Sequence, residues 1–160
     1  MSTSLPLPPA LTDLAGSPVL GLLLESRIPA RLAWVAPDGA PRVAPLWFTW
    51  TGESVVVSTF AGSAKLAGLV PGVPVALCID TEDFPARSVT MRGVVATVEA
   101  VRGLTPEYEA AAMRYLGERM GRTWCAALPA AADQVRVEIR PTSAVVVDMA
   151  VDLPFFAGAR

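Results

Sequence analysis

The sequence predicts a mainly β protein, an antiparallel β-barrel of about seven strands with helices inserted between them. Short β-type runs are separated by turn signals rich in glycine and proline, and only three helix patterns interrupt them. That order does not show the regular strand–helix alternation of a parallel sheet. Gly93 lies in the middle of the longest strand pattern, where closing a barrel requires a bulge or a bend.

The length of 160 residues fits one domain with a genuine core. We expect an N-terminal arm over residues 1–16, a single domain over 17–150 and a C-terminal tail over 151–160. The domain begins with Ser17 and Pro18, which are typical of a helix N-cap and first helical position. The leucine-rich residues that follow predict a short buried helix to about Arg27.

The first half of the domain is predicted as a meander of three antiparallel strands, at about 31–35, 41–50 and 54–59. Asp38-Gly39 is a hairpin signal between the first two. Pro45 inside the second strand indicates a sheet edge or a bulge, because proline cannot donate to a strand ladder.

Further along, Ser63 and the residues after it predict a short helix to about Val70. The remaining predicted elements are a strand over 75–80 that is buried on both faces, a strand over 88–100, a helix over 105–120, and two strands over 135–140 and 144–149. Pro141-Thr142 separates the last two strands. Residues 121–132 have no clear period and receive no assignment.

Composition excludes several classes of function. Apolar residues make up 52% of the chain and charged residues 18%, which indicates a folded protein. A net charge of −2 without a basic run argues against nucleic-acid binding. No apolar stretch is long enough to span a membrane and no signal peptide is recognisable, so we expect a cytoplasmic protein. Cys78 and Cys125 lack metal-ligand spacing and are expected to be reduced.

Histidine is absent from the chain. This excludes His-based zinc sites, Ser-His and Cys-His nucleophile pairs, and a His-ligated haem. We expect no metal site and identify no general acid or base, so the catalytic residues remain unknown. Tyr108, Tyr115 and Trp124 are interpreted as packing residues, although Trp124 could also cover a planar ligand.

A candidate anion site follows the third predicted strand. Ser58 and Thr59 supply hydroxyls, Ser63 is a natural N-cap, and Lys65 is the only lysine among 13 basic residues. Hydroxyls, free helix amides and an ammonium would together bind a phosphate. A strand, a turn and a capped helix are also an ordinary structural connection, and the local pattern leaves both interpretations open.

The order of these segments resembles the pyridoxamine-phosphate-oxidase-like split-barrel flavoproteins, including their deazaflavin-dependent relatives. The resemblance covers roughly residues 20–148. It depends on Gly39-Ala40-Pro41-Arg42-Val43-Ala44-Pro45-Leu46-Trp47, Val57-Ser58-Thr59, Ser63-Ala64-Lys65-Leu66-Ala67-Gly68-Leu69 and Val89-Thr90-Met91-Arg92-Gly93.

The resemblance implies an FMN-binding split barrel and a homodimer with two flavin sites at the subunit interface. The strand from Arg42 to Trp47 would follow the isoalloxazine ring, and the Ser58-Thr59 and Lys65 segments would hold the phosphate. The implied cofactor contacts come from Arg42, Val43, Ala44, Pro45, Leu46, Trp47, Ser58, Thr59, Ser63, Ala64, Lys65 and Met91.

The resemblance implies an FMN-dependent oxidoreductase that transfers a hydride between the flavin and a small organic substrate. A reductase that uses the deazaflavin coenzyme F-420 is the first alternative. Many relatives carry Arg-Asn where this chain has Ala67-Gly68, and the loss of that charge favours FMN over a coenzyme with a long anionic tail. A non-catalytic binder of a flavin or another planar ligand, or a purely structural module, remains open.

Overall fold

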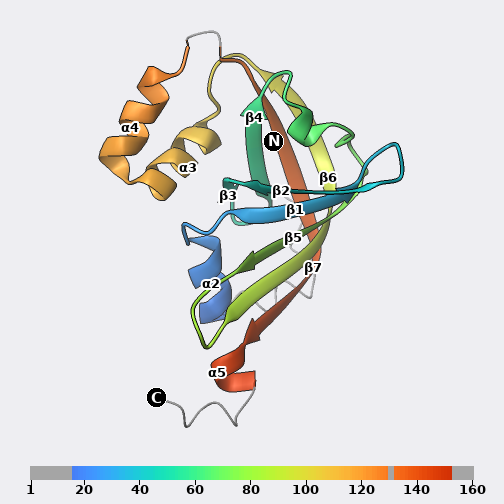
Figure 1. Cartoon of the computed structure of the whole chain (residues 1–160), viewed down its shortest axis with the longest axis vertical. Coiled ribbons are helices and arrows are strands. Elements are labelled where there is room, and N and C mark those ends of the chain that lie inside the picture. The colour runs from blue at the N-terminus through green and yellow to red at the C-terminus, as the bar shows by residue number, and fades with distance from the viewer. Residues whose placement is uncertain (1–15, 130–131, 153–160) are drawn as a thin grey trace, which may run out of the picture.

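In the computed structural model, residues 16–129 and 132–152 are described, apart from the side chain of Lys65. The predicted N-terminal arm and most of the C-terminal tail therefore lie outside the described residues. Seven strands form one antiparallel sheet in the order β2-β1-β5-β6-β7-β4-β3, and this sheet is not closed (Figure 1). The predicted mainly β, split-barrel fold is confirmed. The strands are β1 (Ala30–Val35), β2 (Pro41–Leu46), β3 (Phe48–Trp50), β4 (Val55–Phe60), β5 (Pro74–Asp80), β6 (Arg87–Val101) and β7 (Gln134–Asp148).

The two edges of the sheet, β2 and β3, are neighbours in the chain and are joined through Trp47. The prediction of one strand over 41–50 within a meander is therefore wrong. β2 pairs with β1, whereas β3 pairs with β4, which in turn pairs with β7. Leu46 and Phe48 are both buried, so the alternating pattern continues across Trp47 and gives no sign of the break. The expectation that Pro45 lies on an edge strand is confirmed.

β6 and β7 are long strands that pair along most of their length. The two predicted strands around Pro141 are one continuous strand, because the register shift at Arg92/Gly93 places Pro141 opposite Gly93. A Cβ at Gly93 would lie 2.6 Å from the Arg140 carbonyl oxygen, so only glycine permits this close approach. The predicted bulge at Gly93 is confirmed.

The core lies on the inner face of the curved sheet. Its fully buried members include Leu32, Phe48, Val57, Val89 and Ile139. β5 was predicted to be buried on both faces, but its burial alternates: Val75, Leu77 and Ile79 are buried, while the residues between them are half-exposed. The outer face of β5 is therefore part of the molecular surface.

The helices are α2 (Pro18–Leu24), α3 (Pro106–Leu116), α4 (Glu118–Ala127) and α5 (Met149–Asp152), and a 3₁₀ turn, η1, spans Ala64–Leu66. Ser17 caps α2 and Thr105 caps α3, as the sequence predicts. The helix predicted over 105–120 is wrong at its C-terminal end, because α3 ends at Leu116 and α4 begins at Glu118 and continues into the unassigned segment. The two helices contact each other so closely that a Cβ at Gly121 would lie 2.7 Å from the Ala112 carbonyl oxygen. None of the helices in the described part is long and apolar enough to cross a membrane.

Candidate functional site

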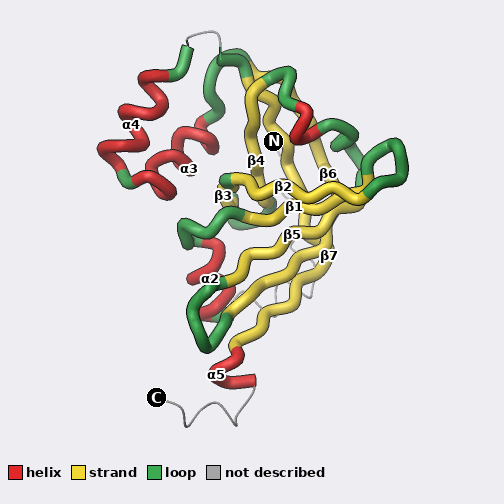
Figure 2. The backbone as a smooth tube through the Cα atoms, in the orientation of Figure 1, coloured by secondary structure: helices red, strands yellow, loops and turns green. Residues whose placement is uncertain are grey.

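A cavity of about 410 Å³ lies between the β1–β2 hairpin and η1. In the hairpin tip, the Ala36 N–H donates to the Ala40 carbonyl at 3.0 Å and Gly39 takes a φ of +80°. The Trp34 indole N–H donates to the Ala67 carbonyl at 3.2 Å and connects the hairpin to the segment after η1. The hairpin tip and η1 lie on the opposite side of the view from α3 and α4 (Figure 2).

The cavity brings together four of the predicted cofactor contacts, Arg42, Val43, Ala44 and Ala64. Its remaining lining comes from Trp34, Ala36, Pro37, Asp38 and Ala67. The wall is thus mostly apolar, with one basic and one acidic side chain. This combination suits a ligand with a flat apolar body and an anionic group.

The two charged residues of the cavity form an ion pair. Arg42 donates to an Asp38 carboxylate oxygen at 2.7 Å, and the other oxygen accepts the Ala40 N–H at 3.0 Å. The hydrogen bond from Ala40, assisted by the positive charge of Arg42, lowers the pKa of Asp38 below its ordinary value of 3.8. Asp38 is therefore ionised near neutral pH and is no proton donor there.

The helix predicted over Ser63 to Val70 is wrong, because only the three-residue turn η1 forms. Gly68, which follows shortly after, has a φ of +87°, and a Cβ there would lie 2.6 Å from Pro37 Cδ. This conformation stops helical propagation and places the chain against the hairpin tip. A single turn supplies little dipole, so the expected contribution of a helix dipole to an anion site is small. The backbone of Lys65 belongs to η1, but its side chain lies outside the described part.

Ser58 and Thr59 lie at the end of β4, and their side chains point to opposite faces of that strand. The Ser58 hydroxyl forms a 2.8 Å hydrogen bond with the Thr105 hydroxyl at the start of α3. It thereby faces the helices and not the cavity. Ser63 donates its backbone N–H to the Phe60 carbonyl at 3.1 Å, within the turn that precedes η1.

The other predicted contacts lie in three different environments. Met91 is 1% exposed and Leu46 is buried, so both side chains belong to the core and offer almost no surface to a ligand. Pro45 is exposed on the outer side of β2. The indole of Trp47 stacks on Tyr115 with a centroid distance of 5.1 Å and an interplanar angle of 8°. Trp47 thus packs under the helices, and only its backbone is left for a role along a ring.

Sequence reasoning missed Trp34 and Asp38 as cavity residues. A signal for both existed, because counting outward from the Asp38-Gly39 turn places Trp34 opposite Arg42. The turn motif was interpreted only as a hairpin signal, so its acidic side chain was not connected with the arginine four residues later.

The flank at β3 and β4 is filled with aromatic side chains. Trp47 lies 6.0 Å from Tyr108 and 6.3 Å from Trp124 between ring centroids, and the Trp124 indole N–H donates to the Tyr108 hydroxyl at 3.0 Å. Burial raises the pKa of both Tyr108 and Tyr115, so the two phenols stay neutral. The interpretation of these residues as packing residues agrees with these contacts.

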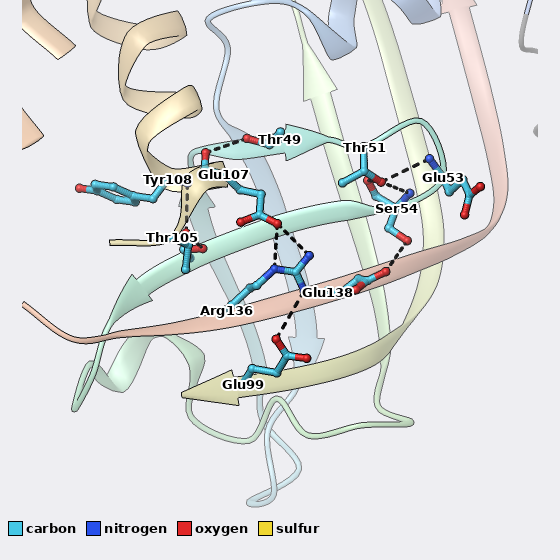
Figure 3. A network of polar contacts seen from close by, with 11 residues as sticks. Thr49, Thr51, Glu53, Ser54, Glu99, Thr105, Glu107, Tyr108, Arg136 and Glu138 are labelled. Atoms are coloured by element: carbon cyan, nitrogen blue, oxygen red, sulfur yellow. Dashed lines mark hydrogen bonds and ion pairs between the residues drawn. The ribbon is translucent and has the colours of Figure 1, made fainter. Parts of the chain in front are cut away.

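An ionic network fastens α3 to the sheet on the same flank (Figure 3). Arg136 of β7 donates to Glu107 at 2.9 Å and to Glu138 at 3.2 Å, and Glu99 lies 4.0 Å away. The Ser54 hydroxyl donates to Glu138 at 2.9 Å. Although several carboxylates meet here, no group of side chains suited to a metal ion occurs among the described residues.

Comparison with known families gives a match over most of the chain. The family model described as pyridoxamine 5′-phosphate oxidase matches residues 20–148. The chain belongs to this family. The span agrees with the range over which the sequence resembles split-barrel flavoproteins, and it includes every part of the cavity. A comparison with curated proteins finds no match.

Solved structures of similar fold include proteins whose names mention different ligands. An F420 reductase is 29% identical, with 77% of this chain and 93% of that chain covered and a TM-score of 0.57. A heme storage protein from Vibrio cholerae is 18% identical, with 82% and 93% covered and a TM-score of 0.54. An FAD binding protein from Mycobacterium smegmatis is 19% identical, with 82% and 94% covered and a TM-score of 0.51. The last two show the split-barrel fold alone.

Proposed function

We propose that this member of the pyridoxamine 5′-phosphate oxidase family is a flavin-dependent oxidoreductase that binds FMN and acts on a small organic substrate. The cavity between the β1–β2 hairpin and η1 carries the proposal. It gathers Arg42, Val43, Ala44 and Ala64, which the resemblance implies as cofactor contacts and which come from two separate motifs of the sequence. Membership of the family supports the same conclusion.

The residues present fit a phosphorylated flavin. The volume of about 410 Å³ lies within the usual range of ligand sites, about 300–1,000 Å³. Arg42 supplies a fork of N–H donors for a phosphate, and Lys65 is adjacent in sequence to the lining residue Ala64. The alanines of the wall leave room for a flat ring, and β2 is an edge strand whose outer backbone groups are open for hydrogen bonds.

In this proposal the bound flavin supplies the hydride chemistry. The chain binds the phosphate with Arg42 and Lys65, orients the ring along β2 and excludes water with the apolar wall. Asp38 stays ionised and neutralises part of the charge on Arg42. Because Asp38 is not a proton donor near neutral pH, the side chains that line this cavity bind and orient the cofactor and the substrate.

We also propose that two copies associate through the outer face of the sheet, where the cavity of one copy would be completed by the other. Paired residues across β1, β5, β6 and β7 form a row of side chains on this face, Arg31, Cys78, Thr90 and Val145, of which only Arg31 is charged. Val43 and Val145 are 68% and 63% exposed. An exposed apolar face of this kind is typical of an isologous interface.

The dimer is tested by Val145→Glu, which would place a charge in the interface and weaken association about tenfold or more. Sedimentation equilibrium measures the dissociation constant. Met120→Glu on α4 is the control, since Met120 is a comparably exposed apolar residue away from this face. A wild-type protein that stays monomeric at high concentration would contradict the proposed association.

The cofactor assignment is tested by titrating the apoprotein with FMN and following flavin fluorescence. Lys65→Ala should weaken binding tenfold or more, because a charge-assisted phosphate contact contributes about 1.5–3 kcal/mol. Arg122→Ala, which removes an exposed cation on α4, should leave binding unchanged. No FMN binding by the wild-type protein, together with a colourless fresh preparation, would refute the proposal.

A deazaflavin-dependent reductase is the second candidate. The observation in its favour is the 29% identity to the F420 reductase, which is covered over 93% of its length. Side-by-side titration with FMN and coenzyme F-420 separates the two. If the deazaflavin binds more tightly and is reduced or oxidised in turnover, it is the cofactor in place of FMN. The proposed site is then unchanged.

A further inference from the structure

The ion pair at the cavity mouth brings an acidic group to the place where a phosphate would bind. Arg42 Nη2 lies 2.7 Å from Asp38 Oδ2, and both residues line the cavity. Arg42 belongs to β2 and Asp38 to the hairpin tip, four positions earlier. The pair forms within one hairpin and needs no other part of the chain.

The two partners are held differently. The Asp38 carboxylate is fixed by the turn, because Oδ1 accepts the Ala40 N–H at 3.0 Å and the Gly39 N–H donates to the Ala36 carbonyl at 2.8 Å. Arg42 reaches the carboxylate with the end of a long, half-exposed side chain. The guanidinium can therefore change partners while the carboxylate stays in place.

Among the described side chains that line the cavity, Asp38 and Arg42 are the only charged ones, and their charges cancel. An exposed ion pair of this kind is weak. A phosphate dianion offers a guanidinium a stronger, two-pronged contact, so it can take Arg42 from Asp38. After that exchange the Asp38 carboxylate remains beside the phosphate and repels it.

We propose that Asp38 sets the affinity of this cavity for phosphorylated ligands by competing with the phosphate for Arg42. The inference rests on the proposed flavin site and identifies within it a residue that determines charge selectivity. Because a carboxylate ligand carries a single charge, Asp38 competes with it for Arg42 more effectively than with a phosphate dianion. Asp38 thereby restricts Arg42 to ligands whose anionic group carries enough charge to displace the Asp38 carboxylate.

The test is Asp38→Asn, which removes the charge and keeps the side-chain oxygen that accepts the Ala40 N–H. We expect the dissociation constant for FMN to fall about three- to tenfold, as expected for losing a weak ion pair and a nearby repulsion. Binding of riboflavin, the same ring without a phosphate, should not change. In an Arg42→Gln background the part of the Asp38→Asn gain that comes from competition for Arg42 should disappear, so the remaining gain should be smaller.

Glu118→Gln is the matched control, because Glu118 and Arg122 form an i, i+4 ion pair on α4, away from the cavity. Thermal unfolding of each variant shows that it is folded. An unchanged or weaker FMN affinity in Asp38→Asn overturns the inference while the flavin site stands, and so does an equal gain for riboflavin. Failure of the wild-type protein to bind FMN overturns the proposed function and this inference with it.

Discussion

The two flanks of the sheet end in neighbouring strands of the chain, yet they have opposite character. At β2 the side chains beside η1 are small, and the space between them stays open as a cavity. At β3 and β4 the space is filled by Trp47, Tyr108 and Tyr115 and fastened by the Arg136 network. The difference is one of side-chain volume: alanines leave a hollow on one flank, while aromatic rings fill the other.

From this contrast we expect the helical flank to contribute stability and the cavity flank to contribute the proposed binding. Substitutions on the helical flank should therefore change the free energy of unfolding and leave ligand affinity unchanged. Substitutions at the cavity should do the reverse. Three changes on the helical flank test this division, in order of decreasing expected effect.

The largest effect is expected for Arg114→Met. Arg114 donates to the Leu24 carbonyl at 3.1 Å and to the Phe48 carbonyl, and its guanidinium lies 4.6 Å from the centre of the Phe48 ring. Its loss leaves two part-buried carbonyls without these donors, so unfolding should be easier by about 2–4 kcal/mol. Urea denaturation measures this.

Arg119→Met on the exposed side of α4 is the control for Arg114→Met and should change stability by less than about 0.5 kcal/mol. FMN affinity should be the same in both variants at a temperature where they are folded. A specific loss of FMN affinity in Arg114→Met would show that the two flanks are coupled.

A smaller effect is expected for Ser58→Ala. The hydroxyl bonds Thr105 at 2.8 Å, so its loss should cost about 1 kcal/mol of stability. Thr59→Val changes a hydroxyl on the opposite face of β4 and is the comparison variant. It shows whether an effect of Ser58→Ala is specific to the face that carries Ser58. If Ser58→Ala weakens FMN binding as strongly as Lys65→Ala does, the Ser58 hydroxyl serves the cofactor, and the division between the flanks fails.

The smallest effect concerns pH. Burial alone would raise the pKa of Glu138, but hydrogen bonds from Ser54 and Arg136 outweigh it and leave the pKa below its ordinary value of 4.5. A carboxylate with a lowered folded-state pKa stabilises the protein above its unfolded-state pKa, and this stability is lost as the pH falls through the folded-state value.

Glu138→Gln should therefore cost below about 1 kcal/mol near neutral pH, and the difference from wild type should shrink as the pH falls below 4.5. Urea denaturation at several pH values measures the difference. Glu118→Gln, in an exposed pair on α4, should show a smaller effect. A difference in unfolding free energy between wild type and Glu138→Gln that stays constant from neutral to acid pH would show that Glu138 acts through packing and not through its charge.

Much of the fold follows from local patterns. Thr105-Pro106 and Ser17-Pro18 identified two helix starts, because capping is determined by a few adjacent residues. The edge position of Pro45 and the bulge at Gly93 followed from backbone constraints. The strand break at Trp47 could not be predicted, since the alternation of buried residues continues through it and only the pairing partners differ.

The candidate site was predictable only in part. Arg42 and Ala64 lie in motifs that are recognisable in the chain, and the structure brings them to one cavity. The short extent of η1 depends on the contact between Gly68 and Pro37, which is a tertiary contact and leaves no local pattern. The involvement of Ser58 with Thr105 similarly depends on the docking of α3, 47 residues later in the chain.

The helices α3 and α4 are inserted in the connection between the paired strands β6 and β7. Val101 of β6 faces Gln134 of β7, and the Gly103 N–H donates to the Asp133 carboxylate at 3.0 Å, so the insertion leaves and returns at almost the same point. Lengthening, shortening or exchanging it would not shift the register of either strand. The α3–α4 pair can therefore diverge between relatives while the flank with the cavity keeps its geometry.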